Sequence, residues 1–235
     1  MLKKSKISHI KIHSDEWHHS RLAKFTSSEI SRLFSGFMSY VRLKVGEEMT
    51  GKSAKGEIDT EATRWGGFYE AEALQKFGQK MQLEFLVTQQ LITESGSRFG
   101  STPDGLIVKR LSPDETEYEV ETVEVKCPPT FDNYLLLFEC ETPQDLKSAK
   151  KEYYWQVLDQ MDNCEALVGN FVAYHPDFRA GNMKHIVFNS NQVIEKGKVK
   201  EFPIFNDLRE LRQKKQEAVA MFEKIRDKLM TAGLV

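Results

Sequence analysis

Three side chains near the middle of the chain have the types and spacing needed to hold a cation beside a phosphate. Asp104 stands at a turn before a β-like run at 105–110, and Glu124 and Lys126 stand two residues apart in a second run at 118–126. Because the side chains of a strand alternate between its two faces, Glu124 and Lys126 project from the same side. If the intervening residues turn the chain back, the two runs form a hairpin that brings Asp104 level with Glu124.

Two carboxylates in this position favour a hard divalent cation. Mg²⁺ prefers oxygen ligands, binds few protein carboxylates and keeps positions for water and substrate phosphate. Asp104, Glu124 and the carbonyl group of Val125 form such a ligand set, with Mn²⁺ as a substitute metal. The same pattern also fits a surface hairpin that only carries charges, because Asp, Glu and Lys are common and the gap between them is free. Other stretches of the chain bear on this choice.

Composition indicates one soluble domain. The chain has 235 residues and a net charge of −2, so we expect a single domain over 1–235, and any DNA contact must use a local basic surface. The cysteines Cys127, Cys140 and Cys164 lack C-x-x-C spacing, which argues against a thiolate metal site. No apolar run approaches the roughly 18 residues of a membrane span, and residues 1–17 lack the apolar core of a signal peptide. We therefore expect a cytoplasmic protein without membrane contact.

A candidate anion site lies near the N-terminus. Arg21 precedes Thr26 and Ser27, which are followed by Glu29 and an apolar run with helical spacing, so we predict a helix that begins at Thr26 or Ser27. The free N–H groups of a helix start attract anions, and a guanidinium group binds phosphate through two parallel hydrogen bonds. The alternative is an ordinary helix cap beside a surface arginine.

Together these motifs resemble the phage lambda exonuclease family, which belongs to the PD-(D/E)xK nuclease superfamily. The matching segment reads W-H-x-x-R-L-x-x-x-T-x-S-E from Trp17, and the nuclease triad follows it. The resemblance implies an alkaline 5′-to-3′ exonuclease of double-stranded DNA with a restriction-endonuclease-like α/β fold, in which a mixed central β-sheet is flanked by α-helices. It also implies that Arg21 and Ser28 hold the 5′-phosphate, that the protein is a homotrimer, and that a single-strand annealing protein is its partner.

The resemblance assigns two more residues. Glu70 matches a helix glutamate that helps to bind the catalytic metals, with Glu72 as the competing candidate. Gln156 matches a catalytic glutamine on the helix that follows the active-site strand; a buried structural amide is the other interpretation, and the two do not exclude each other. The doublet Gly66 and Gly67 costs a helix about 1 kcal/mol per residue relative to alanine, which suggests the close approach of another backbone or of a ligand.

Hydrophobic periodicity predicts the remaining elements. A helix from Thr60 has Trp65, Tyr69, Ala73 and Phe77 on its core face. The long amphipathic helix at 206–230 either closes the core or contacts another subunit. The other expected segments are a tail or edge strand at 1–13, a mobile loop at 41–60, short strands at 85–87 and 91–92, an apolar core stretch at 131–138, one helix from 142 to 164, and strands at 166–174 and 183–189.

The sequence thus predicts a Mg²⁺-dependent deoxyribonuclease that digests linear duplex DNA from its 5′ ends and leaves 3′ overhangs for phage-type recombination. Two alternatives remain open. One is a structure- or sequence-specific endonuclease of the same fold, and the other is a non-catalytic DNA-binding protein.

Overall fold

A mixed β-sheet lies at the centre of the computed structural model, which describes residues 1–8, 10, 14–54, 60–83, 86–88, 91–94, 96–114, 116–190, 193–195, 198–200 and 203–233. Its strands follow the order β10-β9-β8-β7-β4, and β1 pairs with the first residues of β8. The β8–β9 pair is parallel and the other pairs are antiparallel. The strands are β1 (Leu2–Lys3), β4 (Leu86–Thr88), β7 (Gly105–Leu111), β8 (Glu117–Lys126), β9 (Val168–Tyr174) and β10 (Met183–Asn189).

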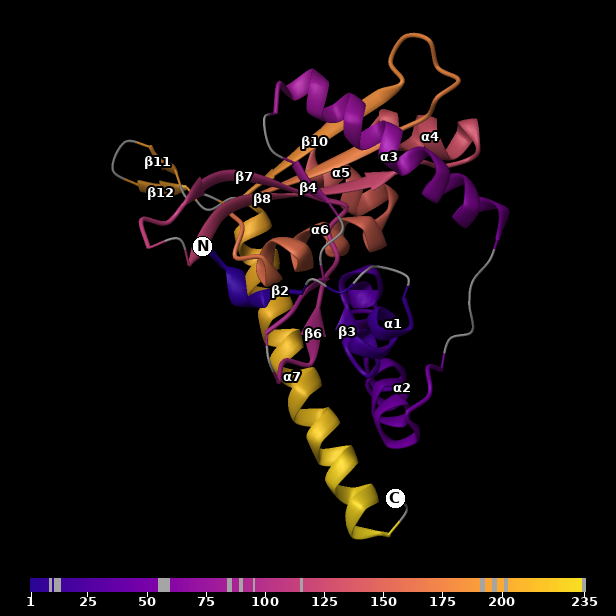
Figure 1. The fold of residues 1–235 in the computed structure, drawn as a ribbon, viewed down its shortest axis with the longest axis vertical. Helices are drawn as coiled ribbons and strands as arrows, with labels where there is room; N and C mark the ends of the chain where they lie inside the picture. The colour runs from indigo at the N-terminus through magenta and orange to yellow at the C-terminus, as the bar shows by residue number, and fades with distance from the viewer. Residues whose placement is uncertain are drawn as a thin grey trace.

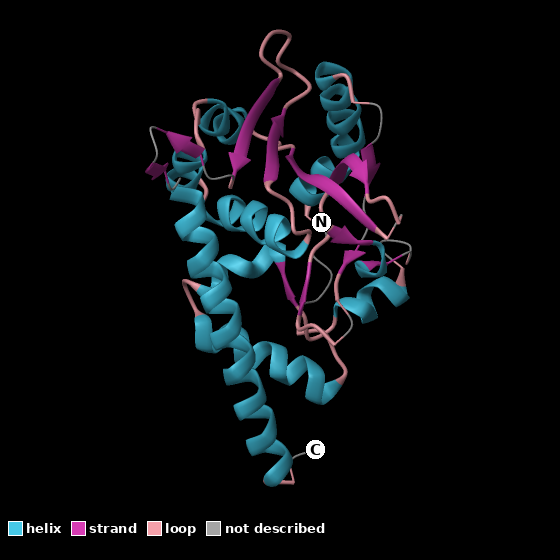
Figure 2. Ribbon diagram, turned by 90° about the vertical axis from the view of Figure 1, so that its left-hand side faces the viewer, coloured by secondary structure: helices cyan, strands magenta, loops and turns pink. Residues whose placement is uncertain are grey.

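Helices cover both faces of this sheet, and a long C-terminal helix extends away from it (Figures 1 and 2). The helices are α1 (Asp15–Arg21), α2 (Phe37–Thr50), α3 (Glu61–Met81), α4 (Phe131–Phe138), α5 (Pro143–Ala149), α6 (Lys151–Asn163) and α7 (Pro203–Thr231), with 3-10 helices η1 (Lys4–Lys6) and η2 (Ser27–Leu33). Short strand pairs complete the fold: β2 (Ile7–Ser8) with β5 (Leu91–Ile92), β3 (Phe25–Thr26) with β6 (Phe99–Gly100), and β11 (Val193–Glu195) with β12 (Lys198–Lys200).

The alternation of side chains along β8 and β9 divides the core into two layers. Val125 and Val172 pack with Phe77 of α3 on one face of the sheet. Phe171 of β9 packs with Val157 of α6 on the other face. The sheet is therefore covered by apolar contacts on both sides, and the polar end of β8 lies between α3 and α6.

Helix α7 closes the core. Leu208, Leu211 and Phe222 are buried, and they belong to the same cluster as Tyr40 and Val45 of α2. This confirms the long helix expected at 206–230 and shows that its apolar face closes the core. Among the described residues, no helix combines the length and apolar character required to cross a membrane.

Several sequence-based predictions are confirmed. The hairpin of β7 and β8 forms, as do the antiparallel strands β9 and β10. Helix α3 begins after Thr60, whose hydroxyl accepts a hydrogen bond from the N–H of Thr63 in a capping box, and its apolar stripe is the expected one. The strands expected at 85–87 and 91–92 correspond to β4 and β5, and Phe85 lies outside the described residues.

The loop expected at 41–60 is wrong over residues 41–50, which lie in α2. Val41 and Val45 are buried one turn apart, and Lys44 between them is buried through an ion pair with Glu47, 2.9 Å long. A lysine and a glutamate in a buried stripe conceal its periodicity, because both residue types normally face water. Residues 55–59 of that expected loop lie outside the described residues.

Three other expectations need correction. The helix start near Thr26 is the 3-10 helix η2 rather than an α-helix. The single helix expected at 142–164 breaks at Lys150, where neither Gly nor Pro marks the break. Over residues 1–8 the chain forms short strands, which confirms the edge-strand alternative for this segment. The stretch 131–138 is a helix of which only one face enters the core. Tyr134 and Leu137 are buried, whereas Phe131, Leu135, Leu136 and Phe138 are exposed.

Candidate active site

The hairpin register brings the two acidic positions to the same level. Gly105 pairs with Val123, so the residue before the first strand lies beside Glu124 and Val125. The Oδ2 atom of Asp104 accepts a hydrogen bond of 2.7 Å from the N–H of Val125. The geometry that the sequence predicted for this end of the sheet is therefore present.

Glu124 is enclosed by hydrogen-bond donors. Its side chain is 1% exposed, and Lys126 forms an ion pair with its Oε1 atom. The Nε2 atom of Gln156 donates to the same oxygen at 2.5 Å, and the Nε2 atom of Gln160 donates to Oε2 at 2.5 Å. Gln156 therefore contacts the acidic residue directly rather than the lysine.

Sequence reasoning missed Gln160, which is fully buried. The available signal was its spacing of four residues from Gln156, which places both amides on one face of α6. A buried carboxylate is stable only when its oxygens are paired. The two glutamines therefore fix the orientation of Glu124.

The charges at this site perturb one another. Burial raises the pKa of Asp104 well above its usual range, and the negative charges of Glu124 and Glu70 raise it further. Burial lowers the pKa of Lys126, but Glu124 and Asp104 outweigh it, so this pKa is raised. The Lys126 side chain is therefore an ammonium group at neutral pH. Burial also raises the pKa of the neighbouring Cys127 thiol to about 12.

A cleft of about 660 Å³ opens beside this end of β8. Glu70 lines it from α3, opposite Val125 and Lys126. The competing candidate, Glu72, is instead engaged by Tyr174, whose hydroxyl donates to it at 2.6 Å, and by Lys76 at 2.7 Å. The structure therefore brings Glu70, and not Glu72, to the Asp104 site.

The glycine doublet of α3 also lines the cleft. A Cβ atom built on Gly66 or Gly67 meets no described atom within 4 Å outside the helix's own backbone. The expectation that another backbone approaches this doublet is therefore wrong for the described residues. A ligand remains the alternative.

The donor set suits a hard cation without forming a complete cage. No group of three or more His, Cys, Asp or Glu side chains is placed to hold a metal within the part of the chain that the structure describes. Asp104 and Glu124 supply carboxylate oxygens, and the mutual repulsion that raises the pKa of Asp104 is the repulsion a divalent cation would relieve. The residues present fit Mg²⁺ or Mn²⁺ if water, the Val125 carbonyl group and substrate fill the other positions.

The candidate 5′-phosphate residues lie on α1 and η2. The guanidinium group of Arg21 lies 4.1 Å from the centre of the Trp17 ring, and burial lowers its pKa despite the nearby charge of Glu29. Ser28 is exposed at the start of η2. The expected cap is different in detail, because Thr26 makes no capping hydrogen bond with its side chain.

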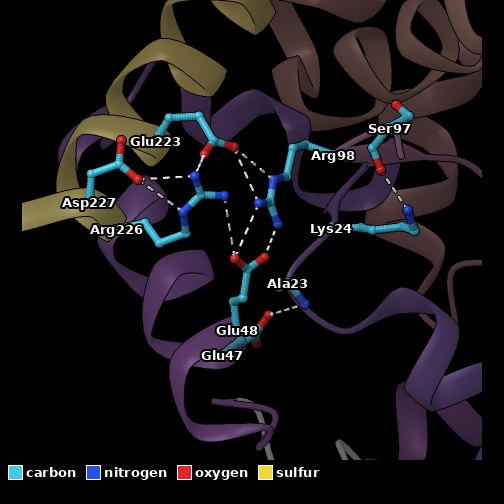
Figure 3. Close-up of polar contacts among 9 residues, drawn as sticks. All are labelled: Ala23, Lys24, Glu47, Glu48, Ser97, Arg98, Glu223, Arg226 and Asp227. Atoms are coloured by element: carbon cyan, nitrogen blue, oxygen red, sulfur yellow. Dashed lines mark hydrogen bonds and ion pairs between the residues drawn. The ribbon is translucent and has the colours of Figure 1, made fainter. Parts of the chain in front are cut away.

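Polar contacts hold the turn that follows Arg21 (Figure 3). Ala23 has a left-handed backbone with φ of 59°, and its N–H donates to Oε2 of Glu47 at 3.2 Å. The ammonium group of Lys24 donates to the carbonyl oxygen of Ser97 at 2.6 Å. Beside this turn, Arg98 bridges Glu48 of α2 and Glu223 of α7, with an Arg98–Glu223 distance of 3.2 Å.

A small parallel strand pair connects the two parts of the candidate site. Phe25 of β3 pairs with Phe99 of β6. Helix η2 follows β3 directly, and Asp104 follows β6 by four residues. Because the strands are parallel, the chain leaves both at the same end of the pair. The segments that carry Ser28 and Asp104 therefore both begin at the same end of the β3–β6 pair.

Comparison with known proteins identifies the family. The model of the YqaJ-like viral recombinase domain matches residues 16–166, a range that contains every candidate site residue. The chain belongs to this family. No curated relative of known sequence matches this YqaJ-like chain.

Solved structures share the fold of this YqaJ-like chain. The alkaline exonuclease LHK-Exo from Laribacter hongkongensis is 20% identical, with a TM-score of 0.70, and the match covers 94% of this chain and 100% of that one. The structure of LHK-Exo in complex with dAMP gives a TM-score of 0.64 at the same identity and coverage. A phage-related exonuclease from Haemophilus somnus 129PT is 16% identical, with a TM-score of 0.56 and coverage of 89% and 96%.

These matches confirm the resemblance to the phage lambda exonuclease family and the restriction-endonuclease-like fold. At such low identity the structural matches establish the fold and not the reaction. Together with the family model they support a nuclease.

Proposed function

We propose that the protein is a Mg²⁺-dependent 5′-to-3′ exonuclease that digests linear double-stranded DNA in the cytoplasm. The observation that carries this proposal is the convergence of Asp104, Glu124 and Lys126 at one end of the β7–β8 hairpin, beside a cleft. Paired carboxylates next to a lysine suit the hydrolysis of a phosphodiester, in which negative charge develops at the phosphate.

The contacts of each side chain indicate its role in the proposed reaction. Asp104 and Glu124, with Glu70 and the Val125 carbonyl group, would hold the metal. The metal held there would supply polarisation of the scissile phosphate and a lowered pKa for a bound water. Gln156 keeps Glu124 in position through its hydrogen bond. Lys126, which pairs with Glu124, would neutralise charge at the phosphate and orient or deprotonate the water.

Arg21 and Ser28 would dock the terminal 5′-phosphate. A site that requires a strand end directs cleavage to the end of a duplex rather than to its interior. Removal of successive 5′ nucleotides leaves a 3′ overhang, which is the substrate of a single-strand annealing protein. The viral recombinase family model supports a role in phage recombination, and a single-strand annealing protein is the partner we propose for that role.

The experiment that tests the proposal is digestion of linear duplex with and without a 5′-phosphate, in Mg²⁺, in Mn²⁺ and in EDTA. We expect nucleotide release in Mg²⁺ that is faster from phosphorylated ends and absent in EDTA. Nicking of a closed plasmid at a comparable rate would favour the endonuclease alternative. Binding of duplex without cleavage in either metal would favour the non-catalytic alternative. A homotrimer is the expected assembly, and light scattering coupled to gel filtration measures it.

A further inference from the structure

A buried polar cluster joins three elements that lie far apart in the sequence. Asp159 of α6 is fully buried and accepts three hydrogen bonds. The hydroxyl of Ser27 in η2 donates to Oδ2 at 2.7 Å, Asn163 donates to the same oxygen at 2.9 Å, and Lys215 of α7 donates to Oδ1 at 2.9 Å. We call these four residues the Asp159 cluster.

The neighbours of the Asp159 cluster in the sequence belong to the candidate active site. Ser27 directly precedes Ser28, the candidate ligand of the 5′-phosphate. Asp159 directly precedes Gln160, which holds the Oε2 atom of Glu124. The Ser27–Asp159 hydrogen bond therefore connects the segment that would receive the DNA end with the helix that orients the metal-binding glutamate.

The Ser27–Asp159 hydrogen bond can fix the position of η2 relative to α6 in a way that the surrounding apolar contacts cannot. Phe34, the residue that follows η2, stacks on Trp155 of α6 with ring centres 3.8 Å apart and planes 14° apart. Such a flat contact holds η2 against α6, but apolar burial is not directional. The hydroxyl–carboxylate bond is directional and short, so it selects one position of η2 along α6.

Charge balance alone does not require Ser27. Lys215 already pairs with Asp159, and its ammonium group also binds Asp162 at 2.8 Å. Asn163 supplies a further donor to the Oδ2 atom that Ser27 contacts. What Ser27 adds is the attachment of η2 to this pair.

We propose that Asp159, acting through Ser27, is a positioning residue that sets the spacing between the docked 5′-phosphate and the Glu124 end of the metal site. This spacing determines how many nucleotides separate the DNA end from the cleaved bond. The inference rests on the proposed exonuclease function and adds to it the residues that define the length of the product.

Ser27→Ala is the variant that tests the inference. It removes the hydrogen bond and leaves the Asp159–Lys215 ion pair intact, whereas Asp159→Ala would leave Lys215 buried without that partner and risk unfolding. Tyr154→Phe is the matched control, because the Tyr154 hydroxyl also donates from α6 to a carboxylate, Asp207 of α7, at 2.5 Å. That bond does not involve η2.

The assay is digestion of a 5′-phosphorylated and a 5′-hydroxyl duplex in Mg²⁺, with the length of the released products and the ratio of the two rates measured. We expect Ser27→Ala to lower the ratio of the rate on the 5′-phosphorylated duplex to the rate on the 5′-hydroxyl duplex by about tenfold to a hundredfold. This is the scale of effect that a small misplacement of substrate produces. We also expect it to release products of altered length. Tyr154→Phe should match the wild type in both measurements.

Two results would overturn the inference alone, with the proposed function intact. One is a Ser27→Ala variant with wild-type product length and rate ratio, and the other is an equal change in Tyr154→Phe. Wild-type protein that digests both duplexes equally would instead overturn the 5′-phosphate docking, and this inference would fail with it.

Discussion

Replacement of Gln160 by glutamate tests the central contact of the candidate site. The substitution keeps the size and shape of the side chain but places a carboxylate oxygen where an amide nitrogen now lies 2.5 Å from Oε2 of Glu124. Two buried carboxylates at that distance cannot both ionise, so the folded protein must keep one proton between them. The metal-free protein is the form to study, because a bound cation would shield the new pair.

The magnitude follows from proton linkage. An unfolded glutamate has a pKa of about 4.3, so above pH 6 the unfolded chain has released the proton that the folded variant retains. The folded state then binds more protons than the unfolded state, and its stability falls as the pH rises. Relative to the wild type, the free energy of unfolding of the variant falls by about 1.4 kcal/mol per pH unit, or about 2.7 kcal/mol between pH 6 and pH 8. For a chain of this size that corresponds to about 5–11 °C in melting temperature.

Thermal unfolding in EDTA, followed by circular dichroism at several pH values, measures this difference. Gln213→Glu is the control, because the Gln213 amide also donates to a glutamate, Glu217, at 3.0 Å but on the exposed surface of α7. Solvent accommodates that added charge, so its melting temperature should follow the wild type at each pH. A Gln160→Glu variant whose deficit does not change with pH would show that Gln160 does not face the Glu124 carboxylate.

Three further predictions concern the site and the core. Asp104→Asn should abolish Mg²⁺-dependent digestion and leave the fold intact. Because the pKa of Asp104 is raised in the folded state, ionisation of this carboxyl group lowers the stability of the metal-free wild type as the pH rises. The metal-free variant lacks this group, so it should melt above the wild type at alkaline pH and match it at acidic pH. Gly169→Ala should cost about 1–3 kcal/mol, because the new Cβ atom would lie 2.8 Å from the sulfur of Met161. Gly78→Ala should instead stabilise α3 by up to about 1 kcal/mol, because a Cβ atom there meets no described atom within 4 Å outside the helix's own backbone; urea unfolding compares the two variants. The buried Cys127 thiol, with its pKa raised to about 12, should resist iodoacetamide at pH 8 until urea is added, and mass spectrometry would detect early modification.

The sequence predicted those parts of the site that depend on local pattern. Alternation along β8 places Glu124 and Lys126 on one face, and a turn between the two runs predicts that Asp104 reaches the end of β8. The exact register was not predictable from spacing, because the pairing shifts by one residue between Val108 and Arg110. The choice of Glu70 over Glu72 came from the motif, and the structure explains it, because Tyr174 of a distant strand engages Glu72.

The remainder depends on contacts that no local pattern encodes. The ion pair that buries Lys44 and Glu47 in α2 makes a core helix look like a loop. Gln160 resembles any polar helix residue until Glu124, from β8, is placed opposite it. The direction of the pKa shift of Lys126 also required the structure, because burial and the two carboxylates act in opposite senses and only the geometry decides which is larger.

The internal pairing of Glu124 has a practical consequence for handling the protein. Lys126, Gln156 and Gln160 already satisfy this carboxylate, so the fold has its own counter-charge at the place where a metalloprotein often relies on the ion. Small zinc domains, by contrast, unfold when chelators strip them. Purification in chelating buffers should therefore yield a folded, inactive protein whose reaction begins when the divalent salt is added.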